Sequence, residues 1–286
     1  MKTAIQIGNA GAFGLDWPST VAYVQESERI GVDYVWSAEA WGQDAVSPLA
    51  YLAAKTDRVI FGTGIMQISA RAPAMTAMTA MTMATITDDR FVLGLGVSGP
   101  QVVEGMHGIP FDPPLARLRE TVDVIKMGLS GQKIKFRGKY MVFPRPGGEG
   151  KPIAIDQVPR PDLPIYLATL GPRSLKYTGE VADGWLGTTF VAERADAVFP
   201  HIDQGARSVG RRLDELDLQV GGRLDIGDQV DAMVERMRPK MAFQLGGMGS
   251  ATRNFYNDCY RRAGFEVAAK EVQRLWADRR RKEAAE

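Results

Sequence analysis

Short apolar runs alternate with amphipathic stretches along most of this chain, and that alternation restricts the fold more than any other feature. The runs at 32–36 and 91–97, for example, are each followed by a segment with helical spacing. Strands that are almost continuously apolar, separated by helices, are typical of a parallel sheet covered by helices. The sequence therefore predicts an α/β fold built from repeated strand–helix units.

The predicted elements fit one TIM-like (β/α)8 barrel domain over 1–286, since such a barrel needs about 250 residues. Seven strands are predicted, at residues 4–8, 32–36, 59–66, 91–97, 164–169, 185–190 and 216–226. Helices are predicted at residues 16–31, 47–56, 74–87, 115–128, 173–181, 193–212, 228–245, 254–263 and 265–280. No eighth strand is apparent after residue 226, so either helices close the barrel or the last βα unit is absent.

The strand–helix alternation stops between about residues 130 and 163. The stretch 133–143 predicts a hairpin that turns at Arg137–Gly138, and a loop rich in proline and glycine follows it. We interpret this region as an insertion in the barrel. The part from about 228 to 286 is predicted to be helical.

The charge balance and the cysteine content exclude several classes of function. Lys and Arg total 35 against 34 Asp and Glu, which disfavours nucleic acid or an anionic membrane as the main partner. A single cysteine excludes an intrachain disulfide, and we expect no metal site and a reducing, cytoplasmic location. The N-terminal MKTAIQIG predicts a strand rather than a signal peptide, and no run of the ~20 apolar residues that span a bilayer occurs.

Methionine recurs through AMTAMTAMTMAT at 74–85. At helical spacing these residues keep one side of the helix apolar. We interpret the run as a helix packed on the barrel, with methionine filling irregular gaps, rather than as a cofactor site.

Reacting groups of a βα barrel gather at the carboxyl ends of its strands, and WSAEAWGQD (36–44) follows the second strand. Glu39 has Trp36 and Trp41 beside it in sequence. A carboxylate against aromatic surface is disfavoured in its charged form, which suits a proton donor. The alternative is a solvated loop acid.

Glycines mark the ends of the third and fourth strands. In FGTGIMQISAR (61–71) they let the backbone approach a flat ligand, although an ordinary strand exit is the alternative. GLGVSG (94–99) matches the dinucleotide fingerprint G-x-G-x-x-G, but it follows the fourth strand rather than the first, so we reject a Rossmann fold. Glu104 and His107 come shortly afterwards and could face the same mouth, although a lone histidine is more often structural.

The stretch 166–185 joins the fifth strand to a helix that begins with Gly-Pro-Arg-Ser. A helix N-terminus with a nearby arginine, Arg173, suits a phosphate group. A normal βα turn with a solvated arginine is the alternative. Together the four segments suggest a long ligand with a flat ring and an anionic tail.

Four motifs in order, VWSAEAWGQDAVSPLAYLAAKT, FGTGIMQISARAPAMTAMTA, RFVLGLGVSGPQVVEGMHG and PIYLATLGPRSLKYTGEVADGW, resemble the luciferase-like monooxygenase superfamily. Within it they are most similar to the actinobacterial branch of coenzyme F420-dependent oxidoreductases. Related branches bind FMN. The resemblance covers nearly the whole chain and implies a (β/α)8 barrel, although relatives usually continue into another strand and helix.

The resemblance also implies a flavin-like ring at the carboxyl mouth of the barrel, backed by a non-proline cis peptide bond at Gly64–Ile65. The implied cofactor-binding residues are Thr63, Gly64, Ile65, Val97, Ser98, Gly99, Ala168, Thr169, Leu170, Gly171 and Arg173. Relatives often place an acid–histidine pair after the second strand, where this chain has Glu39 and Ala40. The candidate acid is then Glu39, or Glu104 with His107.

The implied function is an F420-dependent oxidoreductase that passes a hydride between the deazaflavin ring and a small, largely apolar organic substrate. Residues available to line the substrate pocket are Trp36, Trp41, Met66, Met106 and Trp185. The alternatives are an FMN-dependent monooxygenase and a non-catalytic flavin- or F420-binding barrel. The family also implies a homodimer, with the helix at 74–87 as a candidate interface.

Overall fold

The computed structural model describes residues 1–8, 16–222, 225–250 and 252–286. These residues divide into two units, Met1–Ser98 with Val102–Ala168 and Gly99–Gln101 with Thr169–Glu286. The single domain over 1–286 stays a prediction. Residues 223 and 224, in the seventh predicted strand, lie outside the described residues.

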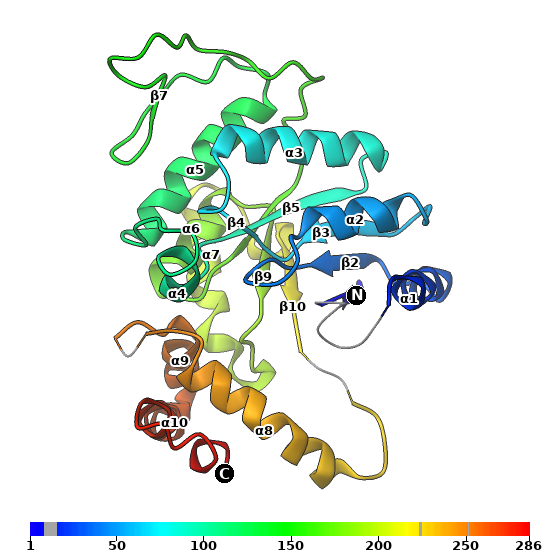
Figure 1. Ribbon diagram of the computed structural model, residues 1–286, viewed down its shortest axis with the longest axis vertical. Helices are drawn as coiled ribbons and strands as arrows, with labels where there is room; N and C mark the ends of the chain where they lie inside the picture. The colour runs from blue at the N-terminus through cyan, green and yellow to red at the C-terminus, as the bar shows by residue number, and fades with distance from the viewer. Residues whose placement is uncertain (9–15, 223–224, 251) are drawn as a thin grey trace. The chain divides into compact units, whose positions relative to one another are not determined.

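A parallel sheet forms the centre of the first unit (Figure 1). Its strands run in the order β1-β2-β3-β5-β8, and the short β4 pairs with β5. β2 and β5 are buried along their whole length, as expected for apolar runs covered on both faces. The bounds are β1 Ala4–Gln6, β2 Tyr34–Ser37, β3 Ile60–Thr63, β4 Met66–Gln67, β5 Phe91–Gly96 and β8 Ile165–Ala168.

The third predicted strand, 59–66, is interrupted between β3 and β4. The Gly64–Ile65 peptide bond is cis, and the chain pairs with β5 again only at Met66. The hydroxyl of Thr63 donates to the carbonyl of Gly94 at 2.8 Å and accepts from its N–H at 2.9 Å. Thr63 therefore ties the end of β3 to β5 just before the chain changes direction.

Helices α3 and α5 lie side by side in the first unit (Figure 1). The predicted packing of the methionine-rich helix is confirmed for Met81 and Met83, which are buried, whereas Met75 and Met78 are 51% and 42% exposed. The short helix α4 was not predicted. The bounds are α1 Trp17–Arg29, α2 Val46–Ala53, α3 Pro73–Ile86, α4 Pro100–Val103 and α5 Pro114–Leu129.

Glu28, near the end of α1, fastens the turn that leads into β3. Its carboxylate accepts N–H bonds from Asp57 at 3.1 Å, Arg58 at 2.6 Å and Val59 at 2.9 Å. Burial acts to raise the pKa of Glu28, but these backbone donors outweigh it and the net pKa lies below its ordinary value.

We expect the substitution E28Q to lower the free energy of unfolding at pH 7 by about 1 kcal/mol, since the contacts are charge-assisted but screened by solvent. A lowered pKa gives stability that is present above the unfolded value of 4.5 and is lost as the pH falls through the folded pKa. Urea unfolding at pH 7, 5 and 3 should show the difference from the unsubstituted protein shrinking at pH 3. A difference that stays constant with pH would contradict this account.

The predicted insertion contains the predicted hairpin. Strands β6 (Phe136–Arg137) and β7 (Val142–Phe143) are antiparallel. The turn spans residues 138–141, so the predicted turn at Arg137–Gly138 is placed too early, because Arg137 still pairs with Val142. Glu120 of α5 accepts N–H bonds from Lys139 at 2.7 Å and Met141 at 2.8 Å. A Cβ on Gly138 would lie 2.4 Å from that carboxylate, so a larger residue would displace the Glu120 side chain from the turn.

The second unit contains a parallel strand pair and several helices. β9 (Gly184–Gly187) pairs with β10 (Asp217–Val220). The helix predicted at 193–212 is wrong in extent, because a 3₁₀ helix at Ala192–Ala197 precedes α7 and α7 ends at Ser208. The helical character predicted for 228–286 is confirmed. Helix bounds are α6 Pro172–Val181, α7 Phe199–Ser208, α8 Val230–Gly246, α9 Phe255–Tyr260 and α10 Glu266–Ala277.

Helices α6 and α7 approach each other at two glycines. A Cβ on Gly205 would lie 1.8 Å from the carbonyl oxygen of Lys176, and one on Gly179 would lie 2.0 Å from that of Ile202. Both obstacles are main-chain atoms, so the backbones touch where no side chain intervenes. None of the described helices combines the length and the apolar character that crossing a bilayer requires.

Candidate cofactor and substrate site

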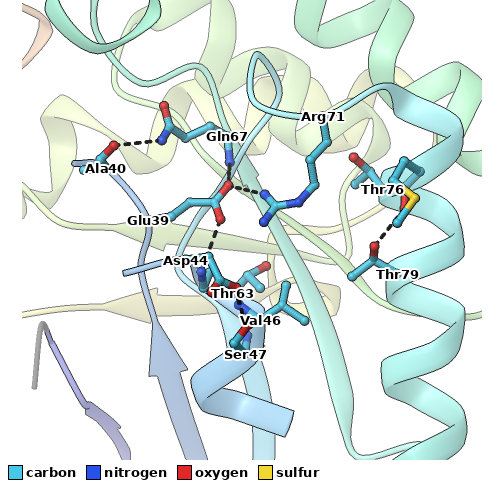
Figure 2. A network of polar contacts seen from close by, with 12 residues as sticks. Glu39, Ala40, Asp44, Val46, Ser47, Thr63, Gln67, Arg71, Thr76 and Thr79 are labelled. Carbon is cyan, nitrogen blue, oxygen red and sulfur yellow. Dashed lines mark hydrogen bonds and ion pairs between the residues drawn. The ribbon is translucent and has the colours of Figure 1, made fainter. Parts of the chain in front are cut away.

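Glu39 lies in the loop after β2 and is buried. One carboxylate oxygen accepts from the backbone N–H of Gln67 at 2.9 Å and from Nη1 of Arg71 at 2.5 Å, and the other accepts from the N–H of Ala45 at 3.2 Å (Figure 2). All three partners are donors. Glu39 therefore acts as an acceptor at each of these contacts and holds three chain segments together.

The same loop is bonded to the segment that carries the cis peptide. The N–H of Glu39 donates to the carbonyl of Ile65 at 3.2 Å, and the N–H of Gly64 donates to that of Ser37 at 2.6 Å. The cis bond at Gly64–Ile65 was implied by the family resemblance and is confirmed. Gln67 adds a side-chain bond to the carbonyl of Ala40 at 3.3 Å (Figure 2), so the loop and the strand end form one polar network.

Trp36 and Trp41 do not make the surroundings predicted for Glu39. Trp36 is buried and stacks on Tyr34 with ring centroids 5.6 Å apart, and its ring fills the space where a Cβ on Gly62 would lie at 2.1 Å. Trp41 is 59% exposed. The described contacts of Glu39 are instead hydrogen bonds from Ala45 at the start of α2, from Gln67 in β4 and from Arg71 in the loop that follows.

A cavity of about 370 Å³ lies in the first unit. Its wall comes from residues 68–73, Val97 after β5, the end of α4, the segment 109–111, the first turn of α5, and Met141 of the inserted hairpin. Most of the lining is apolar, and the polar side chains in it are Ser69, Arg71 and Arg117. Ser69 Oγ is buried and has no hydrogen-bond partner among the described residues. Through Arg71, the Glu39 network reaches the wall of this cavity.

The second pair of predicted acid candidates lies on the loop beyond α4. Glu104 is exposed, and its carboxylate accepts from the N–H of Phe111 at 3.2 Å. Phe111 lines the cavity, so this bond holds part of the cavity wall. His107 is half-buried, and its Nε2 has no partner in the described part of the chain. Met106 is exposed. The described contacts do not include a bond between Glu104 and His107.

The remaining predicted residues of the first unit fall into two groups. Val97 lines the cavity, and Ser98 has a left-handed backbone with φ +57° at the end of β5. Thr63 and Met66 are fully buried, and the hydroxyl of Thr63 is occupied by Gly94. Of these four, only Val97 and Ser98 are accessible enough to meet a ligand in this structure.

The predicted phosphate-binding residues belong to the second unit, apart from Ala168 at the end of β8. Gly171 is the N-cap of α6, and Arg173 is exposed. Gly99 also belongs to this unit. The Leu170 carbonyl accepts from Arg262, which is not among the predicted residues.

Two predicted residues of the second unit are engaged in packing. Trp185 is fully buried in a cluster with Leu175 and Ile202, and its Nε1 donates to the carbonyl of Thr169 at 2.9 Å. The hydroxyl of Thr169 bonds that of Thr178 at 2.7 Å. We therefore treat Trp185 as a core residue and do not carry it into the proposed pocket.

Several site residues are not among the predicted ones, including Gln67, Ser69, Arg71 and Arg117. Arg71 ends the motif 61–71, but its pairing with Glu39 spans 32 residues and depends on the adjacent ends of β2 and β3. Nothing in the sequence distinguishes Arg117 from an ordinary surface residue, because a charged residue in an amphipathic helix is usually solvated. Among the described residues, no cluster of three or more His, Cys, Asp and Glu side chains could hold a metal ion.

Comparison with known proteins gives consistent relatives. A protein named as a coenzyme F420-dependent oxidoreductase from Mycobacterium tuberculosis is 37% identical over 295 residues, which cover 100% of this chain and 84% of that protein. A 5,10-methylenetetrahydromethanopterin reductase from Archaeoglobus fulgidus is 29% identical over 226 residues, covering 79% of this chain but only 65% of the relative, just under two thirds.

Among solved structures, the F420-dependent tetrahydromethanopterin reductase from Methanopyrus kandleri matches with a TM-score of 0.72 and 25% identity, covering 86% of this chain and 72% of that one. This match confirms the predicted TIM-like α/β class of fold. The model of the luciferase-like monooxygenase family matches residues 2–286. The chain therefore belongs to the luciferase-like monooxygenase family.

Proposed function

We propose that this protein is a coenzyme F420-dependent oxidoreductase that acts on a small, largely apolar organic substrate. The names of two of the relatives above support the cofactor. The observation that carries the proposal is the junction of Glu39, Arg71 and the Gly64–Ile65 segment beside an apolar cavity. FMN is the alternative cofactor, and a titration with both cofactors distinguishes the two.

The cavity fits a flat heteroaromatic ring with polar edges. Its volume of about 370 Å³ lies within the ~300–1,000 Å³ usual for small-ligand pockets. Apolar walls suit the face of the ring, and the unpartnered hydroxyl of Ser69 and the guanidinium of Arg71 offer hydrogen bonds to its edge. Ile68, Ser69, Arg71 and Val97 would hold the ring. The phosphate-binding role of 168–171 and Arg173 stays a prediction.

When bound, a deazaflavin ring supplies hydride transfer at its C5 position. The chain's own residues would orient the ring and exclude water from it. Glu39 would act as a positioning residue, because its contact with Arg71 fixes the guanidinium in the cavity wall. This differs from the proton-donor role expected from the sequence. Glu104 and His107 stay candidates for moving a proton.

A fluorescence titration with F420 and with FMN tests the proposal. We expect F420 to bind at micromolar concentration and FMN more weakly, and reduced F420 to be oxidised in the presence of one member of a panel of enones and quinones. Tighter binding of FMN with oxygen-dependent product formation would support a monooxygenase. Binding of F420 without turnover would support a binding protein, and binding of neither cofactor would refute the enzyme.

Replacing Arg71 with methionine (R71M) is expected to weaken F420 binding by about tenfold or more, the effect of losing a charge-assisted hydrogen bond. The matched control is R160M. Arg160 also pairs with a carboxylate, that of Asp89, and its side chain is 23% exposed against 21% for Arg71, but it does not line the cavity. Equal dissociation constants for F420 in the two variants would argue against a cofactor role for Arg71.

We also propose a homodimer, as the family resemblance suggested. The exposed Met75, Met78 and Ile86 of α3 are apolar side chains that a second copy could cover. Size-exclusion chromatography with light scattering tests this proposal. A monomer at all concentrations would exclude it.

A further inference from the structure

Two arginines and no carboxylate are among the residues that line the cavity in the first unit. Arg71 and Arg117 both line it. The charge of Arg71 is offset by Glu39 at 2.5 Å. Arg117 has no carboxylate partner among the described residues, although it is half-buried in the wall. An arginine in a cavity wall that has no carboxylate partner is free to bind an anionic group of a ligand.

Arg117 is held in position without using the outer edge of its guanidinium. Its Nε donates to the backbone carbonyl of Asp112 at 3.2 Å, and its Cζ lies 5.5 Å from the centre of the Tyr140 ring. The terminal nitrogens Nη1 and Nη2 make no described hydrogen bond. These are the two donors that could grip a carboxylate in parallel.

Tyr140, whose ring lies next to Arg117, belongs to a turn that is hydrogen-bonded to α5. The carboxylate of Glu120 accepts the backbone N–H of Tyr140 at 2.9 Å, along with those of Lys139 and Met141. Glu120 is therefore occupied by the hairpin. Lys139 adds a second positive charge, with its Nζ 5.6 Å from the Tyr140 ring. The contacts on this side of the cavity thus hold a cation in place and leave it unpaired.

We propose that the substrate of this protein carries a carboxylate, bound by the two terminal nitrogens of Arg117, on an otherwise apolar body. Ile109, Phe111 and Pro114, which lie in the same wall, would contact the apolar part. The inference rests on the proposed function, and it names the substrate class for that site. An anionic group of the cofactor could offer the same chemistry, and the experiment separates the two sources.

The test is isothermal titration calorimetry with trans-cinnamate and with trans-cinnamamide. Both probes have the same flat apolar body, but cinnamate carries a carboxylate and cinnamamide a neutral amide. Each is titrated into the protein saturated with F420 and into the protein alone. Cinnamate should bind at least tenfold more tightly than the amide, since a bidentate charged pair is lost in the amide. In R117M, cinnamate binding should weaken by about tenfold or more, while amide binding stays unchanged. R117K should recover part of the affinity, because lysine keeps the charge but not the fork.

The control variant is K139M, which removes a positive charge from the same hairpin at a residue that does not line the cavity. It should leave cinnamate binding unchanged. Equal affinity of the unsubstituted protein for both probes, or an equal loss in K139M and R117M, would overturn the proposal. Weaker binding of F420 itself in R117M, without a change for cinnamate, would assign Arg117 to the cofactor and also overturn it.

Failure of the proposed function is distinguishable from failure of this inference. If F420 does not bind the unsubstituted protein, the proposed function fails, and the titrations without cofactor still measure the preference for the carboxylate. If F420 binds but cinnamate has no advantage over cinnamamide, the proposed function stands and the carboxylate site is refuted.

Discussion

The variant E39Q is expected to lose about 2–4 kcal/mol of unfolding free energy, because removing one partner of a buried ion pair leaves the other charge uncompensated. Arg71 would remain in the wall without its carboxylate. In either orientation the new amide would also turn its NH2 group toward a backbone N–H donor, that of Gln67 or that of Ala45. Urea or thermal unfolding measures the loss, and the same variant should bind F420 more weakly.

The control for this prediction is E26Q. Glu26 also pairs with an arginine, Arg29, at 2.6 Å, but both side chains are more than half exposed, so the substitution should leave stability unchanged within error. If E39Q and E26Q unfold at the same urea concentration, the Glu39–Arg71 pair does not hold the loop after β2 to the strand end, and the proposed positioning role falls with it.

The variant G205A is expected to destabilise the second unit by about 3 kcal/mol, at the upper end of the usual cost of overpacking. The added methyl would lie 1.8 Å from the Lys176 carbonyl oxygen, and a main-chain atom cannot move aside by changing a rotamer. Helices α6 and α7 would have to separate, which also exposes Leu175 and Ile202 of the core between them.

Thermal and urea unfolding of G205A should be compared with those of G222A. Gly222 belongs to the same unit, and a Cβ there meets no heavy atom within 4 Å, so this variant reports only the loss of glycine's freedom in the unfolded chain. A stability of G205A equal to that of G222A would show that α6 and α7 do not approach each other as described.

All seven predicted strands are present because their signal is local. β2 and β5 are buried on both faces, and burial of that kind requires the continuous apolar runs that the sequence contains. The interruption between β3 and β4 could not be predicted from hydropathy, since Gly64 and Ile65 are compatible with a strand. That interruption was implied only by the resemblance to a family, which is information about homologous chains rather than about local physics.

The sequence of the long helix predicted at 193–212 contains a proline that marks a helix boundary. Arg194 has non-helical backbone angles, and Pro200 occupies the first turn of α7, where proline is favoured. Proline in the middle of a predicted helix indicates a boundary near it. Amphipathic spacing alone does not show this boundary, because it continues across both elements.

For the site, single residues could be predicted but their partners could not. Glu39 is predicted from its place after an apolar strand beside Trp36 and Trp41. Arg71 and Arg117 acquire their roles only when β2, β3, α5 and the hairpin are in place. Trp185 illustrates the opposite error. A tryptophan near a strand end suits a pocket or a core equally well by sequence, and the structure places it in the core with no exposed surface.

Because Glu120 holds the hairpin by its backbone, the side chains of the turn can change during evolution while the attachment is kept. One carboxylate on α5 holds three backbone N–H groups of the turn, and backbone groups are indifferent to which side chains the turn carries. Residues 139–141 could therefore be exchanged for others while the anchor and the sheet stay as they are. A new specificity could evolve at Tyr140 and Met141, beside Arg117, without disturbing the Glu39 network on which the rest of the cavity depends.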